Sequence, residues 1–273
     1  HGIMKQRRLY NVDGKRSWIS AVLFSFKIFF PLLRERFDIF HVDQSPYIHL
    51  PFCKIIAWIK RKKMIVTWHE VWGKEYWKKY LGKKWWIGFF AEALGVRIAD
   101  MLVAVSDFTA QRLHTIYTVP EEKIFVLPNA VDFSYINASL SQKKKFDIIF
   151  AGRLMAHKNV KLLLQLVDRM RKRFPYLRCL IIGNGPEEEC LRSFVVEKNL
   201  ESTVTIMDFA DEKKYISFLK QSKIFISLSV REGFGLAVLE AMACGLPAIV
   251  ADHPENASQE LVENGITGYV CLL

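Results

Sequence analysis

The stretch that decides the fold is Ser229 to Gly245, SVREGFGLAVLEAMACG. An apolar run over residues 224–229 ends here, and a Gly-Phe-Gly turn at residues 233–235 separates it from a helical pattern that begins at Leu236. Glycines let a backbone approach a ligand closely, and free N–H groups at a helix start attract an anion such as a diphosphate. A strand, a glycine turn and a helix in this order predict an α/β fold with an anion site at the turn.

The same alternation extends through residues 146–273. Continuous apolar runs, typical of buried parallel strands, alternate with amphipathic segments that are typical of helices. The predicted strands are Asp147–Gly152, Leu177–Gly183, Val204–Met207, Ile224–Ser229 and Ala248–Asp252, and the predicted helices are Val160–Arg173, Glu187–Lys198, Asp211–Gln221 and Leu236–Cys244. We expect a parallel sheet with helices on both faces, and the last three residues have the pattern of a further strand.

Shorter apolar runs in the first half predict a second sheet of the same kind. These runs are Phe37–Val42, Met64–Trp68, Met101–Ser106 and Ile124–Pro128. The polar segment 133–145 ends in three lysines and interrupts the pattern, so we place the domain boundary there. Two Rossmann-like domains, 1–140 and 146–273, are therefore predicted. They should share a ligand cleft between the carboxyl edges of their sheets.

The most apolar segment is Ser17 to Leu33, which contains Lys27 and Pro31. It is short for a membrane span, which needs about 20 apolar residues. We predict a helix buried in the first domain, with a membrane-facing helix as the alternative.

The net positive charge of the chain comes from its first half. Residues 1–145 contain 24 Lys and Arg against 12 Asp and Glu, whereas residues 146–273 contain 15 against 16. A basic surface attracts an anionic membrane, a phosphorylated acceptor or nucleic acid. Residues 60–63 (KRKK) and 83–86 (KKWW) mix cations with aromatic side chains nearby, as membrane interfaces do, and no nucleic-acid-binding signature is present. We expect peripheral contact with an anionic membrane, with an ordinary solvated face as the alternative.

Cysteine spacing and acidic motifs argue against metal chemistry. The five cysteines form no CxxC pair, which predicts free thiols in a reducing cytosol rather than disulfides or a zinc site. The sequence has no Asp-x-Asp, so we expect the site to work without a divalent metal. Asn137 and Asn256 begin Asn-x-Ser sequons, which we interpret as chance matches in the absence of a secretion signal.

Several polar residues stand where predicted strands end. Glu240 lies in an apolar helix, where a buried carboxylate needs a partner: a ribose diol, or alternatively a salt bridge. Arg153 and Lys158 follow a strand and could reach a diphosphate, or form a solvated pair. Gly183 and Gly185 begin a dinucleotide-binding fingerprint that Glu188 breaks, so we predict a tight turn facing the cleft.

Two positions in the first half are of the same kind. His69 ends the strand Met64–Trp68 and should face the cleft, although a lone histidine is often structural. Ser106 either lies at the cleft or caps the helix that starts near Phe108.

Together these segments resemble the retaining glycosyltransferases of family 4, which have the GT-B fold. The matching segments are WHE (68–70), AVSDFTAQRL (104–113), VLPNAVD (126–132), GRLMAHKN (152–159), IIGNGPE (181–187), REGFGLAVLEAMACGLPAIVAD (231–252) and ENGITGYV (263–270). Glu232 and Glu240 show the E-x7-E spacing of that family.

The resemblance implies a role for each matching position. The implied catalytic residues are His69 and Glu232; the implied donor-binding residues are Arg153, Lys158, Gly183, Gly185, Glu232, Gly233, Phe234, Gly235, Leu236 and Glu240; and Ser106, Met207 and Phe209 are possible cleft residues. Among these, Arg153 and Lys158 would bind the donor diphosphate, and Glu240 would hold the ribose hydroxyls. No cofactor is implied.

The implied reaction transfers a hexosyl group, with retention of configuration, from a UDP- or GDP-sugar to a glycan or lipid-linked acceptor at the inner membrane face. The first strand and glycine loop of the family, and its closing helices, have no counterpart in this sequence, so we expect an incomplete N-terminal domain. The alternatives are a GT-B epimerase and a non-catalytic basic module that binds membrane or nucleic acid. A hydride-transfer enzyme fits least, because Glu188 breaks its glycine fingerprint.

Overall fold

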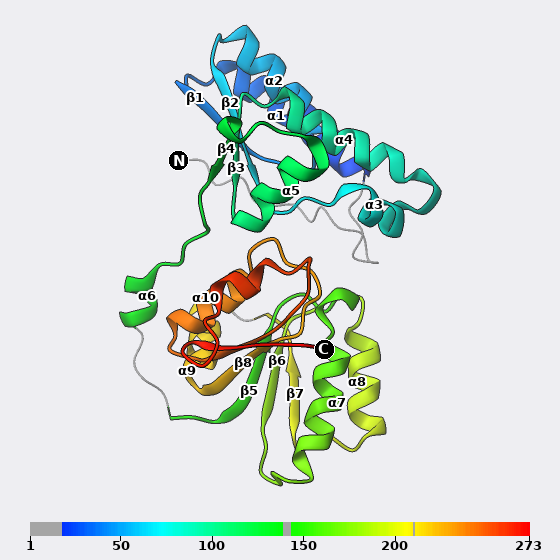
Figure 1. The fold of residues 1–273 in the computed structure, drawn as a ribbon, viewed down its shortest axis with the longest axis vertical. Coiled ribbons are helices and arrows are strands. Elements are labelled where there is room, and N and C mark those ends of the chain that lie inside the picture. Colours follow the sequence, from blue (N-terminus) through cyan, green and yellow to red (C-terminus); the bar gives the residue numbers. More distant parts are fainter. Residues whose placement is uncertain (1–17, 139–142, 210) are drawn as a thin grey trace. The chain divides into compact units, whose positions relative to one another are not determined.

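The computed structural model describes residues 18–138, 143–209 and 211–273. These residues form two compact α/β units that divide between Pro128 and Asn129, and both sheets are wholly parallel, as predicted (Figure 1). Residues 1–17 of the first predicted domain, and residues 139–142 of the predicted boundary, lie outside the described residues.

The first unit contains a four-stranded sheet in the order β1-β2-β3-β4. Its strands are β1 (Ile39–Asp43), β2 (Lys63–Trp68), β3 (Met101–Ala104) and β4 (Ile124–Val126), its α-helices are α1 (Trp18–Arg34), α2 (His49–Ile59), α3 (Gly73–Leu81), α4 (Trp85–Ile98) and α5 (Asp107–Tyr117), and its 3-10 turns are η1 (Gly82–Lys84) and η2 (Glu121–Lys123). Helix α2 shows why these residues are helical. Its buried side chains Leu50, Cys53, Ile56 and Ala57 recur every three or four residues and so line one face.

Helix α1 carries apolar side chains on both its buried and its exposed face. Ala21 and Ile28 are buried on the inner face. The outer face exposes Ile19, Leu23, Phe26 and Phe30, each more than half accessible to solvent. The prediction of a buried helix therefore holds for one face only. Within the described residues, no helix combines the length and apolarity that a bilayer span requires.

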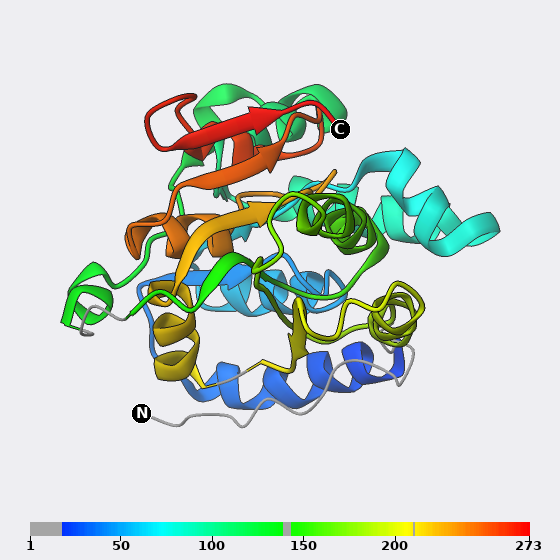
Figure 2. The ribbon, with the colours of Figure 1, turned by 90° about the horizontal axis from the view of Figure 1, so that it is seen from below.

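The second unit contains a six-stranded sheet in the order β10-β9-β8-β5-β6-β7. Its strands are β5 (Phe146–Ala151), β6 (Cys179–Ile182), β7 (Val204–Met207), β8 (Ser222–Ser227), β9 (Ala248–Ala251) and β10 (Gly268–Cys271), its α-helices are α6 (Phe133–Ala138), α7 (Val160–Arg171), α8 (Glu188–Glu197), α9 (Glu212–Lys220) and α10 (Leu236–Ala243), and its 3-10 turns are η3 (Ala156–Lys158) and η4 (Ala257–Leu261). Figure 2 shows β8, β9 and β10 side by side at one edge of this sheet.

Two hydrophobic cores cover the two faces of this sheet. One lies under α7 and α8, and the other under α9 and α10 (Figure 1). All four residues of β6 are buried, which explains its uninterrupted apolar run. Helix α9 is bounded as predicted: the Asp211 side chain caps it by accepting a hydrogen bond from the Lys214 N–H (3.0 Å), and Gln221 is the C-cap.

The division between the units lies ahead of the segment 133–145 where we placed the boundary. Helix α6, inside that segment, is held by the second unit, because Ile136 is 3% exposed and packs in the core under α9 and α10. Val131 packs against the same core. The polar composition of this segment hides the anchoring role of Ile136.

Candidate functional site

Most of the predicted donor-binding residues of the second unit lie in the loops that follow three adjacent strands. β8, β5 and β6 are neighbours in the sheet, and because the strands are parallel their carboxyl ends meet at one edge. The loops that follow them carry the sequence motifs: 152–159 after β5, 183–187 after β6 and 228–235 after β8. This is the edge at which open α/β sheets bind ligands.

Hydrogen bonds tie these three loops together. The Val230 N–H donates to the His157 carbonyl (2.9 Å), and the Asn159 side-chain amide donates to the Leu228 carbonyl (3.0 Å). On the other side, the Leu154 N–H donates to the Asn184 carbonyl (2.9 Å). The loop after β5 is therefore fixed to both of its neighbours.

Gly183 and Gly185 make this close packing possible. A Cβ atom on Gly183 would lie 1.9 Å from the Gly152 carbonyl oxygen, and one on Gly185 would lie 2.4 Å from the Leu154 carbonyl oxygen. Both distances are far shorter than any real contact, so only glycine fits. The observed reasons for these glycines are loop-against-loop packing and positive φ angles, of 151° at Gly183 and 156° at Gly185. Local sequence does not reveal the packing constraint.

Lys158 and Glu232 form an ion pair across two of the loops. The Lys158 Nζ donates to the Glu232 carboxylate, and both side chains are largely shielded, at 17% and 18% exposure. Lys158 ends η3 after β5, whereas Glu232 follows β8. Two residues predicted to contact neighbouring parts of one ligand therefore meet directly. The pair therefore places a lysine, a side chain that binds phosphate, directly beside a carboxylate.

The loop after β9 holds Glu232 from the other side. The Glu232 N–H donates to the Glu255 carbonyl (3.0 Å), and the Glu232 carbonyl accepts from the Ala257 N–H (2.9 Å). Asn256 anchors this loop with its amide nitrogen on the Ala251 carbonyl (2.7 Å) and its amide oxygen on Ser258. Asn256 is 0% exposed, and the sequence pattern marked it only as a sequon.

Helix α10 begins at Gly235, in the left-handed conformation with φ of 96°. Its N-cap makes no side-chain hydrogen bond, which leaves first-turn N–H groups for an anionic ligand. Leu236 is partly exposed, whereas the Phe234 side chain is buried, so Phe234 can offer a ligand only its backbone. Gly233 precedes it at intermediate exposure.

Among residues 18–138, 143–209 and 211–273, the hydrogen-bond partner of Glu240 is a tyrosine and not a lysine or arginine. The Tyr215 hydroxyl on α9 donates to Glu240 Oε2 (2.8 Å). Burial raises the pKa of the Glu240 carboxyl, the hydrogen bond from Tyr215 opposes that rise, and the charge of Glu212 adds to it. Glu240 and Leu236 line a pocket of about 160 Å³ with Tyr215, Glu212 and Ile216 of α9 and with residues of the segment 130–136.

Sequence reasoning did not single out Tyr215. The available signal was its place on the apolar face of α9, beside Ile216 and Leu219, where a buried hydroxyl requires a hydrogen-bond partner. The same reasoning predicts that a partner exists, but it does not identify Glu240.

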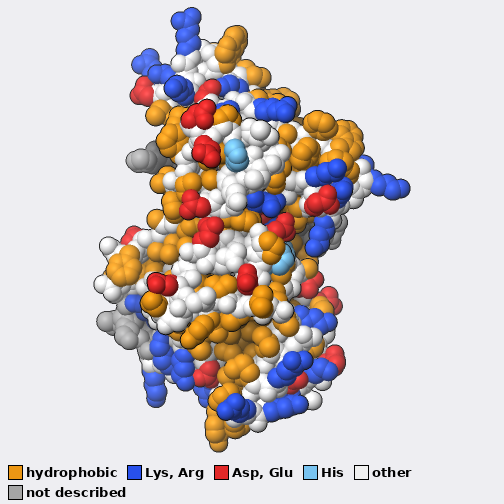
Figure 3. Space-filling view, viewed as in Figure 1, with side chains coloured by type: hydrophobic (Ala, Val, Ile, Leu, Met, Phe, Trp, Pro, Cys, Tyr) orange, Lys and Arg blue, Asp and Glu red, His pale blue; other side chains and the backbone are white. Residues whose placement is uncertain are grey.

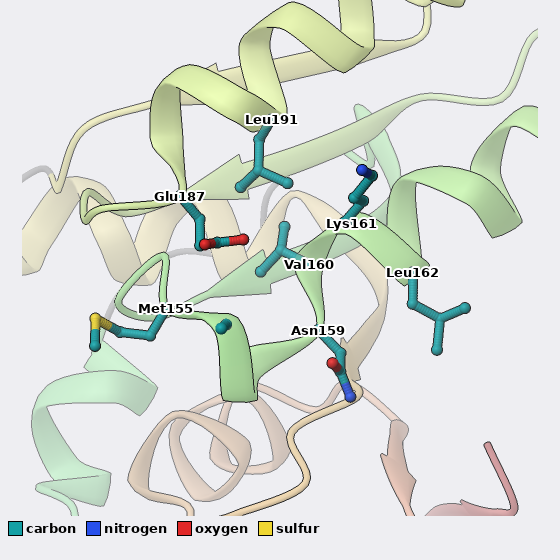
Figure 4. Close-up of a pocket in the computed structure, with 8 residues that line it drawn as sticks. Met155, Asn159, Val160, Lys161, Leu162, Glu187 and Leu191 are labelled. Carbon is teal, nitrogen blue, oxygen red and sulfur yellow. The ribbon is translucent and has the colours of Figure 1, made fainter. Parts of the chain in front are cut away.

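A second pocket lies beside the loop that carries Lys158. Its volume is about 180 Å³, and it opens between the starts of α7 and α8 (Figure 4). Figure 4 shows Val160 and Leu191 pointing toward one another, with the Glu187 carboxylate beside them. The Glu187 N–H donates to the Leu154 carbonyl (3.0 Å), so the pocket wall is tied to the loop after β5.

The remaining predicted residues of this unit are more peripheral. Arg153 is exposed in the loop after β5. Met207 ends the edge strand β7 and packs partly against the core, and Phe209 is 49% exposed. Ala210, the residue after Phe209, lies outside the described residues.

In the first unit, His69 follows β2 at the carboxyl edge of the sheet. Its Nε2 contacts Asp43 Oδ1 (2.8 Å), and its backbone N–H donates to Gln44 Oε1 (2.9 Å). Because Asp43 ends the neighbouring strand β1, the imidazole is oriented by its own sheet. Ser106 is buried and caps α5 by accepting a hydrogen bond from the Thr109 N–H (3.0 Å), which is the alternative that the sequence left open.

The segment after His69 is held by the buried carboxylate of Glu92. Glu92 is 0% exposed on α4 and accepts hydrogen bonds from five described donors. These donors are the Tyr47 hydroxyl (3.2 Å), the Trp72 N–H (2.8 Å), the Gly73 N–H (2.9 Å), the Trp77 indole N–H (2.9 Å) and the Tyr117 hydroxyl (2.5 Å). Burial, followed by the Glu92 charge and hydrogen bond, raises the pKa of Tyr117 well above its usual range, so this donor keeps its proton.

Two family models match the chain, one in each half. Residues 132–272 match the family model described as "Glycosyl transferases group 1", and residues 5–135 match the one described as "Glycosyltransferase Family 4". The UDP-N-acetylglucosamine–peptide N-acetylglucosaminyltransferase GtfA subunit of Streptococcus pneumoniae is 31% identical over 154 residues, covering 56% of this chain and 30% of that protein. The O-antigen biosynthesis glycosyltransferase WclY of Escherichia coli is 30% identical over 230 residues, covering 81% of this chain and 62% of that protein.

A solved structure extends the likeness to the fold. The crystal structure of the pneumococcal O-GlcNAc transferase GtfA in complex with UDP and GlcNAc superposes with a TM-score of 0.62 at 22% identity, covering 82% of this chain and 43% of that one. This likeness bears out the predicted GT-B class of two parallel-sheet α/β domains. The chain spans between about a third and three fifths of the length of these relatives.

Proposed function

The chain belongs to the glycosyl transferases group 1 family, and from this premise we propose that its second unit binds a UDP-linked sugar and that the whole protein transfers the hexosyl group to a glycan or lipid-linked acceptor. The observation that carries the proposal is the shielded Lys158–Glu232 pair, located on two neighbouring loops at the carboxyl edge of the sheet. It supplies a cation for a diphosphate and, directly beside it, a carboxylate for sugar hydroxyls.

Each loop has a part in the proposed donor site. Arg153 and Lys158 bind the diphosphate together with the first-turn N–H groups of α10. Glu232 and the backbone amides of residues 233–235 contact the transferred sugar. Glu240 accepts hydrogen bonds from the ribose hydroxyls, and Met207 and Phe209 flank the base.

The chemistry follows from where charge develops. The bond between the anomeric carbon and the diphosphate oxygen breaks, and the acceptor hydroxyl attacks from the same face, so configuration is retained. The hydroxyl proton passes to the leaving diphosphate. Lys158, Arg153 and the start of α10 stabilise the growing negative charge without a metal, and His69, oriented by Asp43, is the catalytic residue proposed in the first unit.

Uridine is favoured over guanosine as the donor base. The pneumococcal relative is named for UDP-N-acetylglucosamine, and the related crystal structure contains UDP and GlcNAc. The relatives are named for different acceptors, a peptide in one case and an O-antigen in another, so the proposal stays with the acceptor class.

We place the reaction at the inner face of a membrane. The first unit exposes hydrophobic side chains among Lys and Arg (Figure 3). On α2, Trp58 is 77% exposed and immediately precedes Ile59 and the basic run at residues 60–63. Flotation with anionic vesicles should carry the protein, and Trp58→Ala should weaken that binding. Equal flotation with neutral vesicles, or no effect of the variant, would argue against this surface.

Calorimetric titration with UDP, GDP and ADP in the presence of EDTA tests the donor site. We expect micromolar binding of UDP, at least tenfold weaker binding in Glu240→Ala, and unchanged binding in the matched variant Glu263→Ala, whose side chain is exposed outside the site. Binding that appears only with a divalent metal would contradict metal independence. Absence of binding to all three nucleotides would leave the basic-module interpretation in its place.

A further inference from the structure

Helices α9 and α10 contact each other through Tyr215 and Glu240, two side chains that line the same pocket. Tyr215 lies on the apolar face of α9, between core residues, and its hydroxyl donates to Glu240 Oε2 (2.8 Å). A phenol has a single proton to donate, so this proton is committed to Glu240. Within the described part of the chain, no second hydrogen bond reaches the Glu240 carboxylate.

We propose that Tyr215 is a positioning residue for ribose recognition: by occupying Oε2, it fixes the Glu240 carboxylate and leaves Oε1 as the acceptor for the ribose diol. The inference rests on the proposed nucleotide-sugar site and deepens it. It assigns specificity for ribose over deoxyribose to a pair of residues instead of to Glu240 alone.

Orientation is the first reason. A glutamate side chain has several rotatable bonds, and holding it in one conformation at the moment of binding costs affinity. Tyr215 is itself partly buried and packs against the core under α9 and α10, which restricts its side chain. The hydrogen bond from its hydroxyl therefore orders the Glu240 side chain already in the free protein, so nucleotide binding does not have to.

Charge is the second reason. The titratable groups around the pocket are Asp132 and Tyr135 on the segment 130–136, Glu212 and Tyr215 on α9, and Cys244 beside Glu240 on α10. None of the described groups that line the pocket is a cation, although Lys220 and Lys144 lie close enough to Cys244 to lower its pKa. Burial together with Glu212 favours a protonated Glu240. The Tyr215 hydrogen bond is the contribution that favours the carboxylate, which can accept from two ligand hydroxyls.

The test compares UDP with 2′-deoxy-UDP in four forms of the full chain: wild type, Tyr215→Phe, Glu240→Gln and the double variant. We expect Tyr215→Phe to weaken UDP binding roughly tenfold and 2′-deoxy-UDP binding much less, so that the preference for ribose collapses. In the Glu240→Gln background, adding Tyr215→Phe should cause little further loss. Tyr269→Phe, which removes an exposed phenol on β10, should change nothing.

Three results would overturn the inference. The first is an equal loss for both nucleotides in Tyr215→Phe, because a purely structural tyrosine would act on both. The second is an unchanged UDP affinity in Tyr215→Phe, with thermal melting showing a folded protein. The third is a wild-type chain that binds neither nucleotide, which would remove the proposed donor site itself; the first two leave that site standing.

Discussion

Glu92 on α4 and Glu240 on α10 are both glutamates in apolar helices, yet their carboxylates end in opposite situations. Glu92 is wholly buried and receives hydrogen bonds from five described donors of the first unit. Glu240 is partly buried, lines a pocket and receives one hydrogen bond from the described residues, that of the Tyr215 hydroxyl. Both residues have a similar local sequence, an apolar helix. They differ in the number of hydrogen-bond donors that surround the carboxylate.

The difference is one of remaining capacity. A carboxylate has about four lone-pair sites, so Glu92 has none left for a ligand and serves to fix the segment that follows His69. Glu240 keeps acceptor capacity that no donor in the described ranges uses. A buried polar group that its own protein saturates is part of the framework, and one that it leaves partly unsatisfied at a pocket is a candidate for ligand binding.

Removing Glu92 should have the largest effect. Glu92→Ala leaves buried hydroxyl, indole and backbone N–H donors without a partner, and we expect it to lower the unfolding free energy by about 4 kcal/mol. Urea denaturation measures this loss. The matched variant Glu75→Ala, whose side chain is 80% exposed beside Lys78, should lose less than about 0.5 kcal/mol. A loss of similar size in both variants would mean that the buried hydrogen bonds of Glu92 stabilise the protein no more than an exposed ion pair does.

Gly183→Ala tests the framework of the second unit. The new Cβ would overlap the Gly152 carbonyl oxygen, so the loops after β5 and β6 must separate, and we expect a loss of about 3 kcal/mol of unfolding free energy. Gly265→Ala is the control: it has φ of 79° but open space around the added atom, and should cost only about 1 kcal/mol. Equal losses in the two variants would mean that backbone conformation, and not loop packing, demands glycine at residue 183.

Lys158→Met extends the comparison to a third carboxylate, Glu232, which is paired with Lys158. We expect the Lys158 ammonium group to leave Glu232 and bind the diphosphate when UDP is present. Loss of the cation should weaken UDP binding about tenfold, as expected for a charge-assisted contact to phosphate. Calorimetry measures the change, and Lys172→Met, an exposed residue at the end of α7, controls for the altered net charge. Unchanged affinity would assign Lys158 to the framework.

The smallest expected effect is on pH-dependent stability through Glu240. Its raised pKa means that the folded protein holds this proton more tightly than the unfolded chain, so stability falls as the pH rises through that pKa. Glu240→Gln lacks this cost and should be more stable at neutral pH, by less than about 1 kcal/mol because the carboxyl is partly exposed. The gap should close on acidification when unfolding is followed across a pH series. A stability difference that widens on acidification would mean that burial does not determine the pKa of the Glu240 carboxyl.

Local signals in the sequence were enough for the framework. The uninterrupted apolar run of β6 and the capping residues Asp211 and Gln221 of α9 lie where the sequence predicts them, because strand burial and helix capping depend on neighbours along the chain. Ser106 is a partial case, since a serine after a strand fits a cap and a cleft equally well until the Thr109 contact is seen.

Contacts between distant segments were not predictable. Lys158 and Glu232 are 74 residues apart, and Tyr215 and Glu240 are 25 residues apart on different helices. Nothing in either local pattern encodes these partners, because they are fixed by the order of strands in the sheet. The anchoring of α6 through Ile136 escaped prediction for the same reason.

The burial of Asn256 decides which expression hosts suit this protein. An oligosaccharyltransferase that meets the chain before folding would attach a glycan through the amide nitrogen of Asn256, the atom that donates to the Ala251 carbonyl. A glycosylated Asn256 could not enter its 0%-exposed position, and the loop behind Glu232 would stay open. Asn137, exposed on α6, would tolerate the same modification. Production through a eukaryotic secretory pathway should therefore yield misfolded material that Asn256→Gln alone does not rescue, whereas Ser258→Ala removes the sequon and keeps the asparagine in place.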